Sequence, residues 1–207
     1  MLRVVTPEPR RGGRPAVTAL LVLAAALLAA CSAAAAPSPS FDPSTPCGDT
    51  DVQDRPGFFP ELESLIPERL FDETLARRSG RYCSQKTIGL LYERGVRELR
   101  FAGASWYGED PEGMALAIYA APGLDAAVLA ASFEAGARAE RDTELVKSAP
   151  ARIAGIDAIR IDAYVAKRDQ SVIVWDDPSR PGVVRVVIAS DTTPERIEAA
   201  VAALAAR

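Results

Sequence analysis

The chain has 207 residues, and the part expected to be globular, residues 47–207, has a length that suits one domain with its own core. Its formal net charge is −4 at pH 7, and because residues 1–30 carry four arginines and one glutamate, the chain from residue 31 onward stands at −7. That acidity argues against the binding of nucleic acid or anionic lipid through a broad basic face. The chain contains no histidine, which excludes Ser-His and Cys-His nucleophile systems.

The N-terminal segment has the layout of a secretory signal peptide. Four arginines precede an apolar run from Ala16 to Ala30 that is broken only by Thr18. The run is shorter than the roughly 20 residues that a membrane-spanning helix needs. A basic region, a short apolar region and small residues at its end are typical of a cleaved signal. We therefore predict that residues 1–30 are a signal peptide.

The apolar run ends at Leu28-Ala29-Ala30-Cys31. This motif resembles the bacterial lipobox, which has a branched apolar residue, two small residues and a cysteine. In bacterial lipoproteins the thiol of that cysteine receives a diacylglyceryl group, and the signal peptide is cut before it. The resemblance implies that Cys31 is the lipid attachment site and that its acyl chains, such as palmitate, anchor the protein to the membrane. The alternative is an ordinary secreted protein that is cut within the following SAAAAP.

Residues 32–46 hold four prolines and four serines but only one large apolar residue, Phe41. Such a segment cannot bury enough surface to offset the entropy of ordering it. We expect the lipidated cysteine and a flexible tether over residues 31–46, followed by a single globular domain over residues 47–207.

Two cysteines, Cys47 and Cys83, remain in the expected domain. An even pair in an exported protein predicts a disulfide, which would close a loop of about 37 residues. Two free thiols are the alternative. A metal site lacks histidine ligands, and we expect neither a metal nor a cofactor.

Three parts of the domain have the alternation of half-buried strands. The first is a hairpin over about 98–120, in which ELRFAGASWY and MALAIYA flank the turn cluster GEDPEG. The second is DAIRIDAYV, residues 157–165, which places isoleucine, alanine and valine on one face and charged residues on the other. The third is a hairpin over 171–189, in which SVIVW and VVRVVIA flank DDPSRPG.

Helical patterns lie between and after these strands. The sequence predicts a short helix from Ser84 to Arg94 that stops at Gly95, and a longer one over about 124–138. A third begins at Pro194, with Thr193 as its cap. Residues 62–78 have no clear pattern.

These elements predict an α+β fold, an antiparallel sheet with helices packed on one face. The segments MALAIYAAPGLDAAVLAASF and VVRVVIASDTTPERIEAAVA are each a strand, a turn and a helix. Two explanations of this similarity stay open: a duplicated strand–helix unit, and a chance likeness between two alanine-rich segments.

The order LESLIPERLF, then the strand–helix segment PGLDAAVLAASF, then ARIAGIDAIRI and a final strand and helix, resembles a group of bacterial envelope lipoproteins and secreted proteins. The match covers most of residues 60–205 and rests on structural motifs. It implies an α+β fold and an extracytoplasmic location, and it implies no activity and no site residues.

Acidic residues are the first candidates for chemistry. Glu109-Asp110 and Asp176-Asp177 are two acidic pairs, but both lie in expected turns, where acids are common turn formers. Asp49, Asp51 and Asp54 lack the glycine and the distal glutamate of a helix-loop-helix calcium site. A solvated acidic loop is the plainer explanation of these three.

Arginine and tryptophan residues are the remaining candidates. The stretch RRSGR at 77–81 is a local basic cluster that suits an anionic wall polymer or a lipid headgroup, although a solvated surface explains it more simply. Trp106 and Trp175 each lie late in a strand, where they line a ligand groove or pack against a helix.

The sequence thus predicts a lipid-anchored extracytoplasmic protein of the cell envelope. Its domain is expected to bind a protein, polymer or small-molecule partner without catalysing a reaction, and nucleic acid is not expected as a partner. An envelope enzyme that uses carboxylates or a metal is the alternative.

Overall fold

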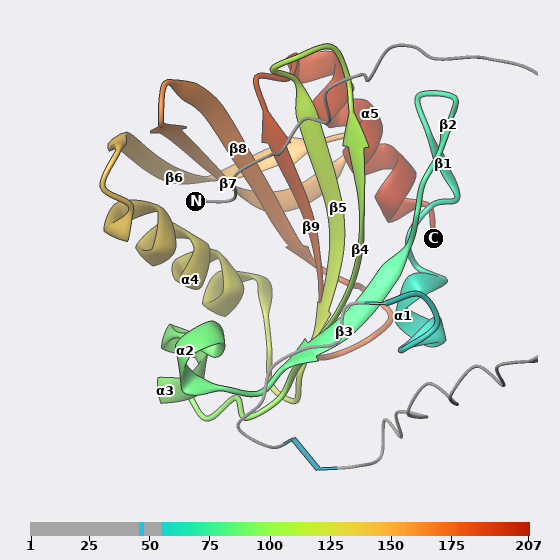
Figure 1. Ribbon diagram of the computed structural model, residues 1–207, viewed down its shortest axis with the longest axis vertical. Coiled ribbons are helices and arrows are strands. Elements are labelled where there is room, and N and C mark those ends of the chain that lie inside the picture. The colour runs from blue at the N-terminus through green and yellow to red at the C-terminus, as the bar shows by residue number, and fades with distance from the viewer. Residues whose placement is uncertain (1–45, 48–54) are drawn as a thin grey trace, which may run out of the picture. The chain divides into compact units, whose positions relative to one another are not determined.

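The computed structural model describes residues 46–47 and 55–207, and its arrangement is shown in Figure 1. A seven-stranded antiparallel sheet has the order β3-β4-β5-β9-β8-β7-β6. Its strands are β3 (Arg78–Tyr82), β4 (Leu99–Tyr107), β5 (Gly113–Ala120), β6 (Thr143–Ile153), β7 (Ile156–Val165), β8 (Arg168–Asp176) and β9 (Val183–Ser190). A small hairpin of β1 (Arg69–Leu70) and β2 (Glu73–Thr74) precedes them. The predicted α+β class with an antiparallel sheet is confirmed.

The predicted strands correspond to strands of the sheet. The hairpin over 98–120 is β4 and β5, the stretch 157–165 is β7, and the hairpin over 171–189 is β8 and β9. At the centre of the sheet β5 pairs with β9, with Leu116 opposite Val187. This pairing joins the two predicted hairpins into one sheet.

The two long helices follow their predicted caps. In α4 (Ala126–Ala139) the side chain of Asp125 accepts a hydrogen bond from the Val128 N–H at 2.7 Å. In α5 (Pro194–Ala205) Thr193 caps the first turn and proline occupies the first helical position.

Three helices are a single turn long: α1 (Pro60–Glu63), α2 (Gln85–Ile88) and α3 (Leu90–Glu93). The helix predicted over 84–94 is therefore two short helices. The break is at Gly89, whose φ of 59° and ψ of −131° suit glycine and few other residues.

The helices lie on both faces of the sheet, which corrects the expectation of a single covered face. On one face α5 and the α1 region pack on the apolar cluster that contains Leu116, Val187 and Ile197. On the other face α2, α3 and α4 pack on a second cluster that contains Val186, Leu129 and Leu91. Figure 1 shows α4 and α5 on opposite sides of the strands.

The physical reason lies in the central strands, which are apolar on both faces. In β9, Val186 faces the α4 side and Val187 faces the α5 side, and neither is exposed. A strand of this kind must be covered on both faces. The sequence VVRVVIA did not reveal this, because the charged Arg185 stands among the residues of the α5 face.

The strand–helix echo is not a symmetric duplication of the structure. Strands β5 and β9 are antiparallel neighbours. A two-fold rotation that exchanges two such strands has its axis perpendicular to the sheet. It maps each face of the sheet onto itself. Two copies related in that way would place α4 and α5 on the same face, whereas they lie on opposite faces.

Residues 58–75, which had little sequence pattern, contribute to the core of the α5 face. The buried apolar side chains of this stretch are Phe58, Phe59, Leu62, Leu65, Ile66, Leu70 and Leu75. The backbone N–H of Phe59 donates to Ser79 Oγ at 2.7 Å, and that hydroxyl donates to Glu63 Oε1 at 2.6 Å. These contacts fix α1 against the β3 edge of the sheet.

Candidate functional site

A cavity of about 480 Å³ opens on the face of the sheet that α4 partly covers. Helix α4 packs over β6 to β9, and α3 contacts α4, so β4 and β5 have no long helix above them (Figure 1). We name this space the aromatic cavity. Its lining residues are Tyr82, Thr87, Ile88, Leu91, Leu99, Tyr119, Leu129, Ser132, Phe133, Gly136, Ala137, Glu140, Val165, Gln170, Val172 and Ile188.

Aromatic rings frame the cavity from two sides. The ring of Tyr82 on β3 stacks on Phe101 of β4, with centroids 4.7 Å apart. The ring of Tyr119 on β5 meets Phe133 of α4 edge to face, with centroids 6.1 Å apart. Paired rings of this kind hold each other in position. The cavity therefore has ordered walls before any ligand enters.

Tyr119 gives the apolar cavity a hydrogen-bond donor. Burial, which is the larger cause, and the nearby Tyr82 phenol raise the pKa of Tyr119 well above its usual range. The hydroxyl therefore keeps its proton at physiological pH. Ser132 and Gln170 add polar groups to the lining. A mostly apolar space with a few placed polar groups is the usual character of a small-molecule site.

Beside the cavity, the side chains of β4 and β5 on the same face are small. Gly103 lies opposite Ala117 in the ladder, and Ser105 lies opposite Ala115. These positions share the α4 side of the sheet with Tyr119, because side chains alternate along a strand. Ser105 and Ala115 line a second hollow on this part of the sheet.

A second hollow of about 390 Å³ lies beside the turn between β4 and β5. Ile188 lines both spaces, so the hollow lies next to the aromatic cavity. Its walls are more polar, because Arg168 donates to the Pro111 carbonyl at 3.1 Å and lies 3.9 Å from the Asp110 carboxylate. At its rim the side chain of Tyr107 is 75% exposed.

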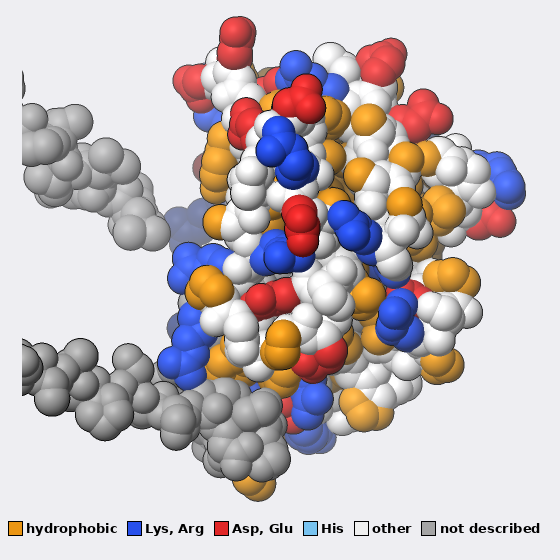
Figure 2. All heavy atoms as spheres, turned by 90° about the vertical axis from the view of Figure 1, so that its right-hand side faces the viewer, with side chains coloured by type: hydrophobic (Ala, Val, Ile, Leu, Met, Phe, Trp, Pro, Cys, Tyr) orange, Lys and Arg blue, Asp and Glu red, His pale blue; other side chains and the backbone are white. Residues whose placement is uncertain are grey.

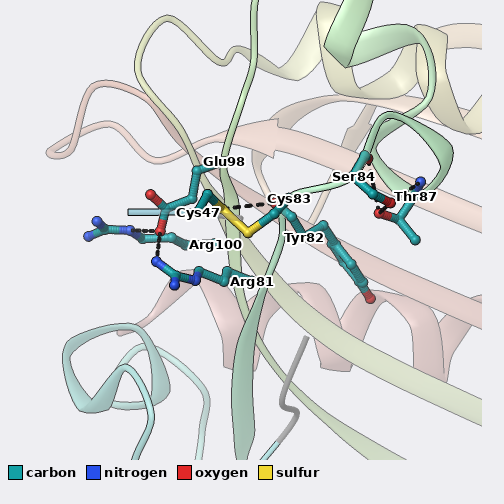
Figure 3. Close-up of a disulfide and its surroundings, with 8 residues drawn as sticks. All are labelled: Cys47, Arg81, Tyr82, Cys83, Ser84, Thr87, Glu98 and Arg100. Carbon is teal, nitrogen blue, oxygen red and sulfur yellow. Dashed lines mark hydrogen bonds and ion pairs between the residues drawn. A yellow bond between two sulfur atoms is a disulfide. The ribbon is translucent and has the colours of Figure 1, made fainter. Parts of the chain in front are cut away.

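Cys47 and Cys83 form the predicted disulfide, with Cα atoms 5.5 Å apart. Figure 3 shows the bond beside Glu98, which binds Arg81 at 3.3 Å and Arg100 at 3.1 Å. The predicted lipid site, Cys31, lies outside the described residues.

The basic stretch 77–81 does not present a common surface. Arg77 pairs with Glu68 at 3.8 Å, whereas Arg81 is buried and pairs with Glu98. Arg77 and Arg81 are therefore divided between two acidic partners.

The two acidic pairs lie at opposite ends of the sheet. Glu109-Asp110 precedes the end at which Gly113 pairs with Ser190, whereas Asp176 pairs with Val184 at the other end. The length of β5 separates these ends by about 23 Å. The pairs therefore share no cleft.

The remaining acidic candidates, Asp49, Asp51 and Asp54, lie outside the described residues. Within the described ranges, no three or more metal-ligating side chains gather in a metal-binding group.

The two tryptophans pack in the core of the α5 face. Trp106 is 5% exposed and its ring lies 4.9 Å from that of Phe71, edge to face, while Trp175 is 3% exposed. Helix packing, the plainer of the two expectations, is what the structure has. The aromatic rings that line the aromatic cavity are instead those of tyrosine and phenylalanine, which were not among the candidates from the sequence. The available signal was that the odd positions of β4 and β5, apart from Leu99, hold only aromatic and small residues.

Among the described residues, no helix combines the length and apolar character needed to cross a membrane. Comparison of the chain with protein-family models, with curated proteins and with solved structures finds no match in any of the three.

Proposed function

We propose that the protein is a lipid-anchored extracytoplasmic binding protein that holds an apolar small molecule in the aromatic cavity and catalyses no reaction. Anchoring through Cys31 rests on the lipobox-like motif that closes the N-terminal apolar run. The binding activity rests on one structural observation, the aromatic cavity between α4, α2–α3 and the sheet.

Size and chemistry support this choice of ligand. The cavity volume of about 480 Å³ falls in the range of about 300–1,000 Å³ that is usual for ligand sites. Ile88, Leu91 and Leu129 supply aliphatic walls, and Tyr119 supplies a donor that fixes orientation. A ligand with an apolar body and one hydrogen-bond acceptor fits these groups. The wide separation of the two acidic pairs favours binding over catalysis by paired carboxylates.

Titration with a fluorescent long-chain fatty-acid analogue tests the proposal. Ser132→Trp, on the cavity side of α4, should fill the space and raise the dissociation constant by about tenfold or more. Ala127→Trp, at an exposed position of the same helix, is the matched control and should bind like the wild type. Circular dichroism and thermal melts verify that both variants fold.

Two results would contradict the proposal. One is a wild-type protein that does not bind the analogue. The other is equal affinity in the wild type and in the folded Ser132→Trp variant, which would place any binding outside the aromatic cavity.

A further inference from the structure

The segment that contains α2 and α3 combines an exposed apolar side chain with exposed basic ones. Leu90 is 41% exposed and is one of three exposed large hydrophobic residues in the described part of the chain. Lys86, Arg94 and Arg97 are exposed around it in sequence, and Glu93 is the only acidic residue within 86–97. We name Lys86, Leu90, Arg94 and Arg97 the α2–α3 surface.

This surface differs in charge from the rest of the protein. The chain from residue 31 onward is acidic, whereas residues 77–100 contain seven basic and two acidic side chains. Within this segment Glu98 pairs with Arg81 and Arg100. The basic residues of the α2–α3 surface are not members of these two pairs. On the face seen in Figure 2, over β1–β2, α1 and α5, acidic and basic side chains are interspersed.

The disulfide places the α2–α3 surface at the end of the domain where the N-terminal chain attaches. Cys83 lies two residues before the start of α2, and it is bonded to Cys47. Cys31 lies sixteen residues before Cys47, a span that reaches at most about 55 Å when fully extended. A lipid on Cys31 would therefore keep the domain within reach of the membrane surface.

We propose that the α2–α3 surface docks on a bilayer surface rich in anionic phospholipid, with Leu90 entering the headgroup region. Each basic side chain near such a surface attracts it electrostatically, and a leucine among basic residues adds apolar burial. The acidic remainder of the domain is repelled, which orients the molecule. The inference rests on the proposed anchor for the nearness of the domain to the bilayer. Because Thr87, Ile88 and Leu91 also line the aromatic cavity, docking brings that cavity close to the bilayer.

Vesicle co-sedimentation tests the docking without the lipid anchor. The chain is used from residue 31 with Cys31→Ser, so that neither the acyl group nor the apolar run 16–30 contributes. The chain used in this experiment still includes the acidic residues Asp49, Asp51 and Asp54. Partition into vesicles rich in phosphatidylglycerol is compared with partition into pure phosphatidylcholine, at low and high salt.

We expect clear binding to the anionic vesicles, little to the neutral ones, and loss of binding at high salt. Lys86→Glu with Arg94→Glu should lower the partition coefficient about tenfold or more, and Leu90→Ser should lower it several-fold. The matched controls are Arg141→Glu with Lys147→Glu, and Leu145→Ser. They make the same chemical changes at or beside β6, the sheet edge opposite β3, and should partition like the wild type.

Equal partition into the two kinds of vesicle, or equal losses in the test and control variants, would overturn the docking surface. A failed anchor is recognised separately, because the Cys31 peptide of the native protein would then carry no lipid mass. Failure of the cavity is recognised by the fatty-acid titration.

Discussion

The guanidinium of Arg185 and the carboxylate of Asp177 form a buried ion pair, with Nη2 2.6 Å and Nε 3.0 Å from Oδ2. Their side chains are 3% and 0% exposed. Arg185 also donates to the Leu204 carbonyl and, at 2.7 Å, to the Arg207 carbonyl. One central strand thereby holds the carbonyl groups at the end of α5, where a positive charge is favourable.

Removal of the carboxylate should destabilise the fold strongly. Asp177→Ala leaves the Arg185 charge buried without its partner, and we expect the free energy of unfolding to fall by about 3–5 kcal/mol. Asp157→Ala removes a carboxylate whose pair with Arg152 is 2.7 Å long but exposed, and should cost under about 1 kcal/mol. Urea denaturation of both variants measures the difference. Similar losses would show that the buried pair contributes no more than a surface one.

The same carboxylate predicts a loss of stability in acid. Burial alone would raise the pKa of Asp177, but hydrogen bonds from the Ser179 side chain and backbone and from Arg185, with the Arg185 charge, outweigh burial and lower the pKa to about 2. A group with a lowered folded-state pKa stabilises the fold above its unfolded pKa of about 4. That contribution, about 2 kcal/mol, should be lost between about pH 4 and pH 2.

Denaturation at a series of acidic pH values measures this loss. In Asp177→Asn the slope of unfolding free energy against pH should be smaller between about pH 4 and pH 2 than in the wild type. Parallel pH profiles for the two proteins would assign the acid sensitivity to other carboxylates.

Loss of the disulfide should lower stability without releasing α1. Cys47→Ser with Cys83→Ser reopens a loop of about 37 residues, and we expect a loss of about 2–4 kcal/mol. Much of the enclosed segment has no clear sequence pattern, but Phe59 and Ile66 are buried in the core of the α5 face. Hydrogen exchange in 58–66 should therefore stay slow in the variant. Fast exchange there at native conditions would show that the bridge, and not the core, holds α1.

Two glycines with similar backbone conformations should respond differently to alanine. Gly123 has φ of +73° and open space around its Cβ position, so Gly123→Ala should cost about 1–2 kcal/mol. Gly182 has φ of +80°, and a Cβ there would lie 2.6 Å from the Ala121 carbonyl oxygen. Gly182→Ala must displace backbone and should cost clearly more. Thermal melts compare the two, and equal melting temperatures would mean that the Ala121–Gly182 contact yields easily.

The sequence predicted elements best where periodicity is strong and faces differ. The stretch 157–165 alternates because its Arg160–Asp162 face is partly solvated, and it was assigned correctly. Strand β6 was missed because its side chains are largely exposed and it includes Pro150, which an edge strand tolerates. Residues 58–75 were missed because their apolar side chains come from turns and single-turn elements that have no period.

The candidate site was not predictable from the sequence for a different reason. Its walls come from elements far apart in the chain, such as Tyr82 and Phe133, which only the packing of α4 and α2–α3 brings together. The tryptophans were the aromatic candidates because they are large and lie near strand ends. Strand parity then placed Trp106 on the α5 face, opposite the cavity.

Native mass spectrometry of the protein extracted from its own membranes tests the account most directly. We predict a covalent diacylglyceryl mass on a chain that begins at Cys31, together with a non-covalent small-molecule adduct that dissociates on activation. The adduct should be absent from Ser132→Trp and present in Ala127→Trp. A wild-type protein with no releasable adduct, or the same adduct in the folded cavity-filled variant, would contradict the account.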